Sequence, residues 1–102
     1  MGQFFKVAKV VDVSSGKLRS VEAGGKRIAL FSLGNEIFAI GDLCSHEGGP
    51  LSEGTIEGEE VECPWHAARF NVKSGAATCP PASDAVERYN VRLSGEDVEV
   101  EV

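Results

Sequence analysis

Residues 89–102 read YNVRLSGEDVEVEV, and this stretch predicts the fold class of the chain. In residues 97–102, three valines alternate with three acidic residues, which is the period-two pattern of a strand with one buried and one solvated face. A similar alternation of apolar and polar side chains runs through residues 89–93. Because Ser94–Gly95–Glu96 between the two runs is a hairpin signal, the stretch predicts an antiparallel β-hairpin.

The same kind of pattern extends toward the N-terminus. Gly24–Gly25 and Gly34–Asn35 are turn pairs, and each of them separates two apolar runs. No stretch has the 3.6-residue periodicity of a helix of four turns. The sequence therefore predicts an all-β framework of antiparallel strands. The further expected strands are residues 5–7, extended to 10–13, and residues 18–23, 27–33 and 37–40.

Length and charge narrow the possible functions. The 102 residues suffice for one domain with a modest core, and the net charge of −6 disfavours nucleic acid and anionic membranes as partners. The acidic balance favours docking onto a basic patch of another protein. No apolar run approaches the ~20 residues of a membrane span, and the first residues lack a secretory signal, so a cytoplasmic protein is expected.

Residues 42–80 differ in composition from the rest of the chain. They hold all three cysteines, both histidines and the only tryptophan. An odd cysteine count does not suit a disulfide scaffold, and cysteines near histidines are more typical of a metal site in a reducing compartment. One short hairpin is expected inside the segment, with residues 55–56 and 61–63 on either side of Gly58. We interpret the segment as a cofactor-holding insertion in the β framework.

Two short motifs carry the candidate metal ligands. Cys44–Ser45–His46 is followed, after 16 residues, by Cys63–Pro64–Trp65–His66, so each motif supplies one thiolate and one imidazole. Two sulfur and two nitrogen ligands suit either a zinc ion or an iron–sulfur cluster. Zinc sites usually pair cysteine with cysteine and histidine with histidine, whereas each motif here carries a mixed pair. The mixed pairs favour a [2Fe–2S] cluster, with two ligands on each iron.

The chain resembles the Rieske-type ferredoxins of aromatic-ring-hydroxylating dioxygenase systems along nearly all of its length. The matching stretches are CSHEGGPLSEG (residues 44–54), VECPWHAARFNVKSG (residues 61–75) and the Pro-Pro-Ala segment at residues 80–82. The resemblance implies a single Rieske domain over residues 1–102. It also implies a Rieske-like antiparallel β-sandwich or barrel framework, with a small inserted cluster-binding subdomain at approximately residues 42–80.

The resemblance also implies one [2Fe–2S] cluster with four protein ligands. Cys44 and Cys63 would bind the inner iron, and His46 and His66 would bind the outer iron near solvent. Two ferric ions, two sulfides and two thiolates sum to zero charge when both imidazoles are neutral, whereas an all-cysteine site starts at −2. Adding an electron is therefore easier with two histidines, which raises the reduction potential into a range of roughly −150 to +300 mV.

Several positions distinguish this chain from the high-potential Rieske proteins of respiratory complexes. Gly49 and Trp65 stand where those proteins have a disulfide between the two loops that carry the ligand motifs, so that bridge cannot form. Ala68 and Phe70 stand where they have a serine and a tyrosine whose hydroxyl groups donate hydrogen bonds in the cluster region. Ala67 replaces a usual glycine without affecting a ligand. Fewer donors stabilise the reduced cluster less, so a low potential is expected.

The remaining notable side chains have simpler interpretations. Leu51 is expected to pack between the loops that carry the two motifs, and Cys79 to be a plain buried thiol. Trp65 is expected to pack at the second loop, with docking of a partner as the lesser alternative. Pro80–Pro81 is expected to form a rigid loop that, by resemblance, covers the cluster. A set of acidic side chains is expected to form a solvated hairpin face that could steer a basic partner. This set is Glu57, Glu59, Glu60 and Glu62.

These inferences predict a soluble electron-transfer protein that is not an enzyme. By resemblance, it would pass single electrons from a flavin-containing ferredoxin reductase to a terminal oxygenase, and a monomer is the simplest expectation. An oxygenase would need a mononuclear iron held by two histidines and a carboxylate, but the chain has only two histidines and the cluster uses both.

Three alternatives remain open from the sequence. The nearest is the small Rieske subunit of an assimilatory nitrite reductase, which shares much of the motif. The second is a zinc-stabilised structural module, which would be colourless. The third is a redox-sensing module that binds a partner in only one oxidation state.

The first prediction concerns the reduction potential. Because Gly49, Trp65, Ala68 and Phe70 remove the disulfide and the hydroxyl donors, we expect a midpoint potential on the order of −150 mV. Voltammetry of the purified protein measures it directly. A midpoint above about +100 mV would contradict the low-potential assignment.

Overall fold

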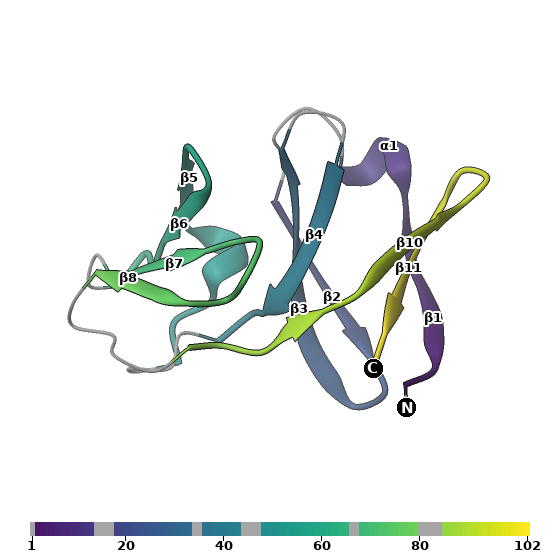
Figure 1. Cartoon of the computed structure of the whole chain (residues 1–102), viewed down its shortest axis with the longest axis horizontal. Helices are drawn as coiled ribbons and strands as arrows, with labels where there is room; N and C mark the ends of the chain where they lie inside the picture. Colours follow the sequence, from purple (N-terminus) through teal and green to yellow (C-terminus); the bar gives the residue numbers. More distant parts are fainter. Residues whose placement is uncertain (1, 14–17, 34–35, 44–47, 66–67, 80–84) are drawn as a thin grey trace.

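The computed structural model describes residues 2–13, 18–33, 36–43, 48–65, 68–79 and 85–102. These residues form antiparallel β-strands, one four-residue helix, α1 (Val10–Val13), and one 3₁₀ turn, η1 (Leu51–Glu53). The prediction of an all-β fold is confirmed (Figure 1). The strands are β1 (Phe4–Lys9), β2 (Leu18–Ala23), β3 (Lys26–Leu33), β4 (Glu36–Gly41), β5 (Thr55–Glu57), β6 (Glu60–Glu62), β7 (Arg69–Asn71), β8 (Ala77–Cys79), β9 (Arg88–Tyr89), β10 (Val91–Ser94) and β11 (Asp97–Glu101).

The strands form three antiparallel sheets. The terminal sheet has the order β1-β11-β10, the central sheet β2-β3-β4-β9, and the third sheet, called here the loop-bearing sheet, β5-β6-β7-β8. In Figure 1 the central sheet stands between the terminal sheet on the right and the loop-bearing sheet on the left. No helix among the described residues is long and apolar enough to cross a membrane.

The C-terminal hairpin matches the expectation from its sequence. Strands β10 and β11 pair from Val91↔Val100 to Ser94↔Asp97, and Gly95 in the turn has a φ of 61°. Val98 and Val100 are fully buried, as the alternation predicts. The hairpin is nevertheless shorter than predicted, because Tyr89 belongs to β9, which pairs with β4 in the central sheet. The chain therefore changes sheets at Asn90.

The first strand also ends earlier than predicted. Residues 10–13 were expected to continue it, but they form the short helix α1. In a strand, Val11 and Val13 would lie on the same face. In the helical turn, Val13 is fully buried while Val11 is 69% exposed, so the turn delivers one valine to the core. The Asp12 carboxylate accepts a hydrogen bond from the Lys9 N–H at 3.1 Å, which stabilises the turn.

Strand β3 is buried on both faces. All five residues from Ile28 to Ser32 are buried. The strand therefore has no solvated face over these residues, in contrast to the C-terminal hairpin. Ile28 and Leu30 face one core, which they share with the terminal sheet, and Ala29 and Phe31 face a second core, which they share with the loop-bearing sheet. Strand β3 is therefore the element on which both cores are built.

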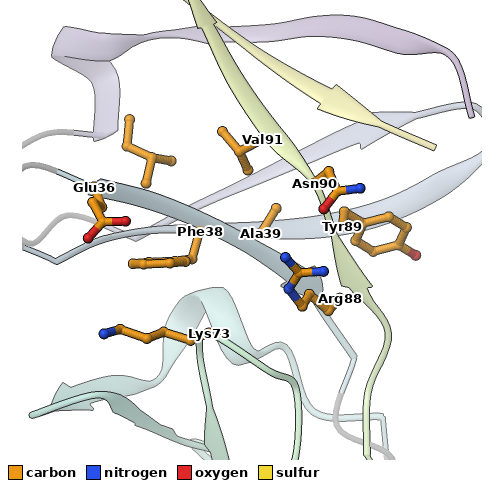
Figure 2. Close-up of a pocket in the computed structure, with 9 residues that line it drawn as sticks. Glu36, Phe38, Ala39, Lys73, Arg88, Tyr89, Asn90 and Val91 are labelled. Atoms are coloured by element: carbon orange, nitrogen blue, oxygen red, sulfur yellow. The ribbon is translucent and has the colours of Figure 1, made fainter.

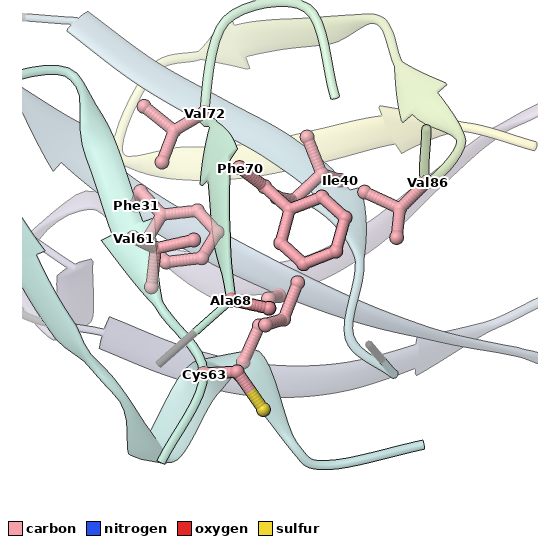
Figure 3. Close-up of a cluster of buried hydrophobic side chains, with 10 residues drawn as sticks. Phe31, Ile40, Val61, Cys63, Ala68, Phe70, Val72 and Val86 are labelled. Atoms are coloured by element: carbon pink, nitrogen blue, oxygen red, sulfur yellow. The ribbon is translucent and has the colours of Figure 1, made fainter. Parts of the chain in front are cut away.

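The two cores lie on opposite faces of the central sheet. The loop-side core is drawn in Figure 3. Fully burying each large apolar side chain stabilises the fold by roughly 1.5–3 kcal/mol. The terminal-side core contains Ala8, Val13, Ala23, Ile28, Leu30, Ala39, Val98 and Val100. The loop-side core contains Ala29, Phe31, Ile40, Leu51, Val61, Cys63, Ala68, Phe70, Val72 and Val86.

Gly75 joins the loop-bearing sheet to the segment that returns to the central sheet. Its φ is 80°, and its carbonyl accepts a hydrogen bond from the Val86 N–H at 2.9 Å. A Cβ atom on Gly75 would collide with the Val86 carbonyl oxygen. At the next residue, the Glu87 carbonyl accepts a hydrogen bond from the Gly41 N–H at 2.8 Å. The close approach at Gly75 therefore brings the returning chain to the edge of β4.

The second prediction compares two glycines with the same backbone conformation. Gly75→Ala should lower the free energy of unfolding by about 3 kcal/mol, since it combines left-handed strain with a backbone collision. Gly25→Ala is the matched control, because Gly25 has a φ of 78° but nothing within 4 Å of an added Cβ. Its loss should be only about 1–2 kcal/mol. Urea unfolding of both variants measures the difference, and equal losses would contradict the role of the Val86 contact.

Candidate metal centre

Cys63 is the one predicted ligand whose surroundings the structure describes. It follows β6 directly, its side chain is 1% exposed, and it lies at the edge of the loop-side core with its sulfur directed away from the Phe70 ring (Figure 3). Cys44, His46 and His66 lie outside the described residues. Among the described residues there is no group of three or more histidine, cysteine, aspartate or glutamate side chains that could hold a metal ion.

The loop between β6 and β7 is closed at its base. The Cys63 N–H donates a hydrogen bond to the Ala68 carbonyl at 2.7 Å, directly after the strand pairs Val61↔Phe70 and Glu62↔Arg69. This second loop contains the exposed Pro64 and Trp65. Trp65 was expected to pack, but the residue is 60% exposed, which favours the docking alternative.

The first loop is closed in a similar way. Leu43 and Pro50 form an isolated antiparallel bridge, and the Leu51 N–H donates a hydrogen bond to the Asp42 carbonyl at 2.6 Å. These contacts bring together the two ends of residues 43–50, the segment with the Cys44–Ser45–His46 motif. Leu51 then enters η1 and is fully buried in the loop-side core together with Cys63, which confirms its predicted packing role.

The two loops lie against each other at Gly49. A Cβ atom on this buried glycine would lie 2.7 Å from the Cys63 sulfur and 3.1 Å from the Trp65 ring. Ordinary contacts of a Cβ atom begin near 3.4 Å, so only glycine leaves enough space beside the thiol. The structure thus brings together Gly49 and Trp65, the two positions that would carry the inter-loop disulfide in the high-potential proteins.

The interior side of the site is apolar. Ala68 and Phe70 are both fully buried in the core that contains Cys63 (Figure 3). Neither side chain has a polar atom, so neither can donate a hydrogen bond toward the site. This placement agrees with the expectation that the site lacks the hydroxyl donors of the high-potential proteins.

The predicted acidic face is partly neutralised by two cations. Arg69 Nη2 lies 3.3 Å from a Glu57 oxygen and 3.1 Å from a Glu62 oxygen, and its Nη1 lies 3.6 Å from a Glu60 oxygen. The fourth carboxylate pairs with a lysine, since Lys73 Nζ lies 3.1 Å from a Glu59 oxygen.

The acidic neighbours of Arg69 raise its pKa. The charge of Glu57 is the largest cause that raises the pKa of the Arg69 guanidinium, and Glu62 raises it further. Four carboxylates on two cations leave an excess of negative charge on the β5–β6 hairpin. The solvated face expected from the sequence is therefore a paired network with a residual acidic character.

A cavity of about 180 Å³ lies between the central sheet and the turn after β7 (Figure 2). Lys73 Nζ lies 5.7 Å from the centroid of the Phe38 ring at one side of it, and Arg88 and Tyr89 of β9 line another side. Burial, followed by a hydrogen bond with Glu87, raises the pKa of Tyr89 to about 12. None of the described residues of the two loops lines this cavity.

A second cavity, of about 340 Å³, lies next to Leu43 at the start of the first loop. Leu43, Asp42 and Arg27 contribute to its wall, together with Val86 of the returning segment. Leu43 is 48% exposed at this position.

Some predictions concern side chains that the structure does not describe. Cys79 lies in β8 opposite Arg69, but its side chain is not described, so its predicted burial stays a prediction. Ala67 and Pro80–Pro81 lie outside the described residues.

Known proteins resemble this chain over almost its full length. The chain is 42% identical over 94 residues to the 3-phenylpropionate/cinnamic acid dioxygenase ferredoxin subunit of Shigella boydii, covering 91% of this chain and 88% of that protein. It is 35% identical over 91 residues to the ferredoxin component of the naphthalene 1,2-dioxygenase system of Pseudomonas aeruginosa, covering 89% and 88%.

Solved structures share the fold. The ferredoxin of carbazole 1,9a-dioxygenase from Nocardioides aromaticivorans superimposes with a TM-score of 0.91 at 31% identity, covering 96% of both chains. A complex of reduced oxygenase and oxidized ferredoxin in carbazole 1,9a-dioxygenase contains a chain with a TM-score of 0.90 at 31% identity, covering 96% and 92%. A putative small subunit of an NADPH nitrite reductase matches with a TM-score of 0.81 at 22% identity, covering 96% and 97%, which shows a shared fold alone.

The site suits the cofactor of such proteins. The Cys63 thiol lies at the base of the second loop, Gly49 of the first loop leaves space beside it, and the interior side is apolar. A model of the Rieske [2Fe–2S] domain matches residues 3–90, which include both ligand motifs. This match and the identities of 35–42% to the two relatives show that the chain belongs to the Rieske [2Fe–2S] domain family.

Proposed function

We propose that this chain is the ferredoxin of a dioxygenase system, which supplies single electrons to a terminal oxygenase. The observation that carries the proposal is the length of the match. The ferredoxin components and subunits covered to 88% are electron carriers, and they are the same size as this chain rather than parts of a larger oxygenase. The chain therefore carries one Rieske-type [2Fe–2S] cluster and transfers electrons without catalysing a reaction of its own.

The proposed ligands are the four residues of the two motifs. Cys63 is buried at the interior side of the site, which supports its assignment, with Cys44, to the inner iron. His46 and His66 are assigned to the outer iron at the solvent side. The exposure of Trp65, which directly precedes His66, supports this orientation of the second loop.

A [2Fe–2S] cluster with two thiolate and two imidazole ligands supplies a one-electron couple between roughly −150 and +300 mV. The residues around the site set where in this range the couple lies. Ala68 and Phe70 exclude water from the interior side and donate no hydrogen bond, which favours the low end. A low potential suits a carrier that stands between a reductase and an oxygenase.

The partners are proposed to be a flavin-containing ferredoxin reductase and the terminal oxygenase. The net charge of −6 and the excess of carboxylates on the β5–β6 hairpin support docking onto basic surfaces. A monomer in the cytoplasm is the simplest state for such a carrier. The cysteine–histidine site also suits a reducing compartment.

The alternatives have weaker support. The nitrite reductase small subunit shares the fold at 22% identity, whereas the two ferredoxins of dioxygenase systems share 35–42% of their aligned residues with this chain. A zinc module does not agree with the family match, which names a [2Fe–2S] cluster. A redox-sensing role has no relative among the proteins compared above.

Reconstituted turnover tests the proposed function. The purified holoprotein is mixed with a ferredoxin reductase, its pyridine nucleotide and a candidate oxygenase with an aromatic substrate. We expect substrate oxidation that depends on this chain, and rapid reoxidation of the reduced chain by the oxygenase. Turnover with a nitrite reductase large subunit, and none with any oxygenase, would overturn the proposal in favour of the alternative.

The third prediction concerns the ligands, and the third cysteine provides a matched control. Cys63→Ser and His66→Ala should lose iron and acid-labile sulfide to background, because each removes one of four proposed ligands. Cys79→Ser should retain both at the level of the parent protein, since Cys79 is not a proposed ligand. Iron and sulfide analysis and the EPR signal of the reduced protein provide the measurements. Loss of the cluster in Cys79→Ser, or its retention in Cys63→Ser, would contradict the assignment.

The fourth prediction concerns the space beside Cys63. Gly49→Ala places a methyl group 2.7 Å from the Cys63 sulfur, so it should change the visible circular dichroism of the cluster and reduce cluster incorporation. Gly48→Ala is the control, because Gly48 has a φ of 76° but nothing within 4 Å of an added Cβ. It should lower the thermal midpoint through backbone strain and leave the visible spectrum unchanged. Identical visible spectra for the two variants would show that Gly49 does not crowd the site.

A further inference from the structure

Asp42 is a charged residue with no exposed surface, and it stands two positions before Cys44. Its side-chain exposure is 0%, and it is one of two polar or charged residues that are buried among the described residues. Burying a carboxylate is costly unless donors surround it. The donors around Asp42 therefore show which elements its charge joins.

Three donors surround the carboxylate, and they come from three elements. The Arg27 Nε of β3 lies 2.7 Å from Oδ2, and the Ser20 hydroxyl of β2 donates to the same oxygen at 2.9 Å. The Ser52 backbone N–H of η1 donates to Oδ1 at 2.7 Å. The Arg27 Nε also lies 3.3 Å from the Ser20 hydroxyl oxygen, so the two donors on the central sheet are linked to each other.

The backbone of Asp42 makes two more hydrogen bonds in the same directions. Its N–H donates to the Arg27 carbonyl at 3.1 Å, toward β3. Its carbonyl accepts the Leu51 N–H at 2.6 Å, toward η1. One residue is thus bonded on one side to the central sheet and on the other side to the turn that ends the first loop.

The consequence concerns the whole of the first loop. The loop leaves the central sheet after Asp42 and ends at Leu51 and Ser52, and both ends are joined to the same residue. Removing one partner of a buried charge-assisted hydrogen bond costs far more stability than removing one partner of an exposed pair. The hydrogen bonds of Asp42 therefore hold the junction in one geometry. The placement of the first ligand motif then depends on a junction that is made by residues outside that motif.

We propose that Asp42 is the positioning residue of the metal centre, which sets the first ligand loop on the central sheet through Arg27, Ser20 and the Ser52 N–H. This proposal rests on the proposed function, because it takes Cys44 and His46 as ligands. It predicts that the cluster changes when the junction is altered, although the altered side chains do not bind it.

The experiment compares holoprotein variants at both ends of the ion pair. Asp42→Asn keeps the size and shape of the side chain but replaces one acceptor oxygen with an NH2 group. This NH2 group then faces a hydrogen-bond donor where the carboxylate oxygen accepted one. Arg27→Gln removes the opposite charge and leaves Asp42 without its cation. Glu99→Gln is the control, since Arg92 Nε lies 2.6 Å from a Glu99 oxygen in the terminal sheet and the pair contributes to neither the loops nor η1.

Three measurements separate positioning from a simple effect of charge. These are the midpoint potential, the EPR g-values of the reduced protein and the rate of cluster loss to a chelator. If Asp42 positions the loop, both Asp42→Asn and Arg27→Gln shift the g-values and lose the cluster about tenfold faster than the parent, whereas Glu99→Gln does neither. The two variants remove opposite charges, so a purely electrostatic influence would shift the potential in opposite directions.

Opposite potential shifts with unchanged g-values and unchanged rates of cluster loss would overturn the proposal. If Asp42→Asn does not fold, Ser20→Ala replaces it, because it removes one donor and leaves the ion pair in place. It is expected to shift the g-values in the same sense by a smaller amount, and parent-like g-values in this variant and in Arg27→Gln would also overturn the proposal.

The parent protein separates this failure from a failure of the proposed function. If the parent shows no EPR signal of a histidine-ligated [2Fe–2S] cluster, the ligand assignment fails and the positioning role fails with it. If the parent shows the signal and supports oxygenase turnover while the variants match it in all three measurements, only the positioning role fails.

Discussion

The double-sided burial of strand β3 is the constraint on which the rest of the structure depends. Its side chains alternate between two cores, with Ile28 and Leu30 on one side and Ala29 and Phe31 on the other. A strand with one solvated face could pack against the terminal sheet or against the loop-bearing sheet, but not against both. Because β3 and its partner β4 fill both cores, the site is built on an element that is covered on both faces and fully paired in the middle of its sheet.

The two ligand loops use this rigid support in different ways. The second loop grows directly out of the loop-side core, because Cys63 is part of that core and its N–H is bonded to the Ala68 carbonyl. The described residues of the first loop form no strand of the loop-bearing sheet, and a buried carboxylate joins this loop to the central sheet. Gly49 then allows the two loops to approach each other closely beside the Cys63 sulfur.

Chemistry and packing act together at this site. The same apolar residues that complete the loop-side core, Ala68 and Phe70, leave the interior side of the site without hydrogen-bond donors. The core of this carrier thereby favours a low potential. The charged network of Arg69 and its glutamates lies on the exposed surface of the same sheet, where it leaves a negative excess for partners without disturbing the interior.

The sequence by itself determined the all-β class and the C-terminal hairpin, and it contains the two motifs of the proposed ligands, because period-two alternation, turn pairs and motif spacing are local properties of the chain. It could not determine that Tyr89 leaves the hairpin for β4, since the choice between two sheets depends on which edge is open. Nor could it show that residues 10–13 turn to bury Val13, or that Trp65 stays exposed. Asp42 is the clearest case. Nothing near it in the sequence distinguishes it from a solvated aspartate, and only the packing of β2, β3 and η1 around it brings three donors to one buried carboxylate.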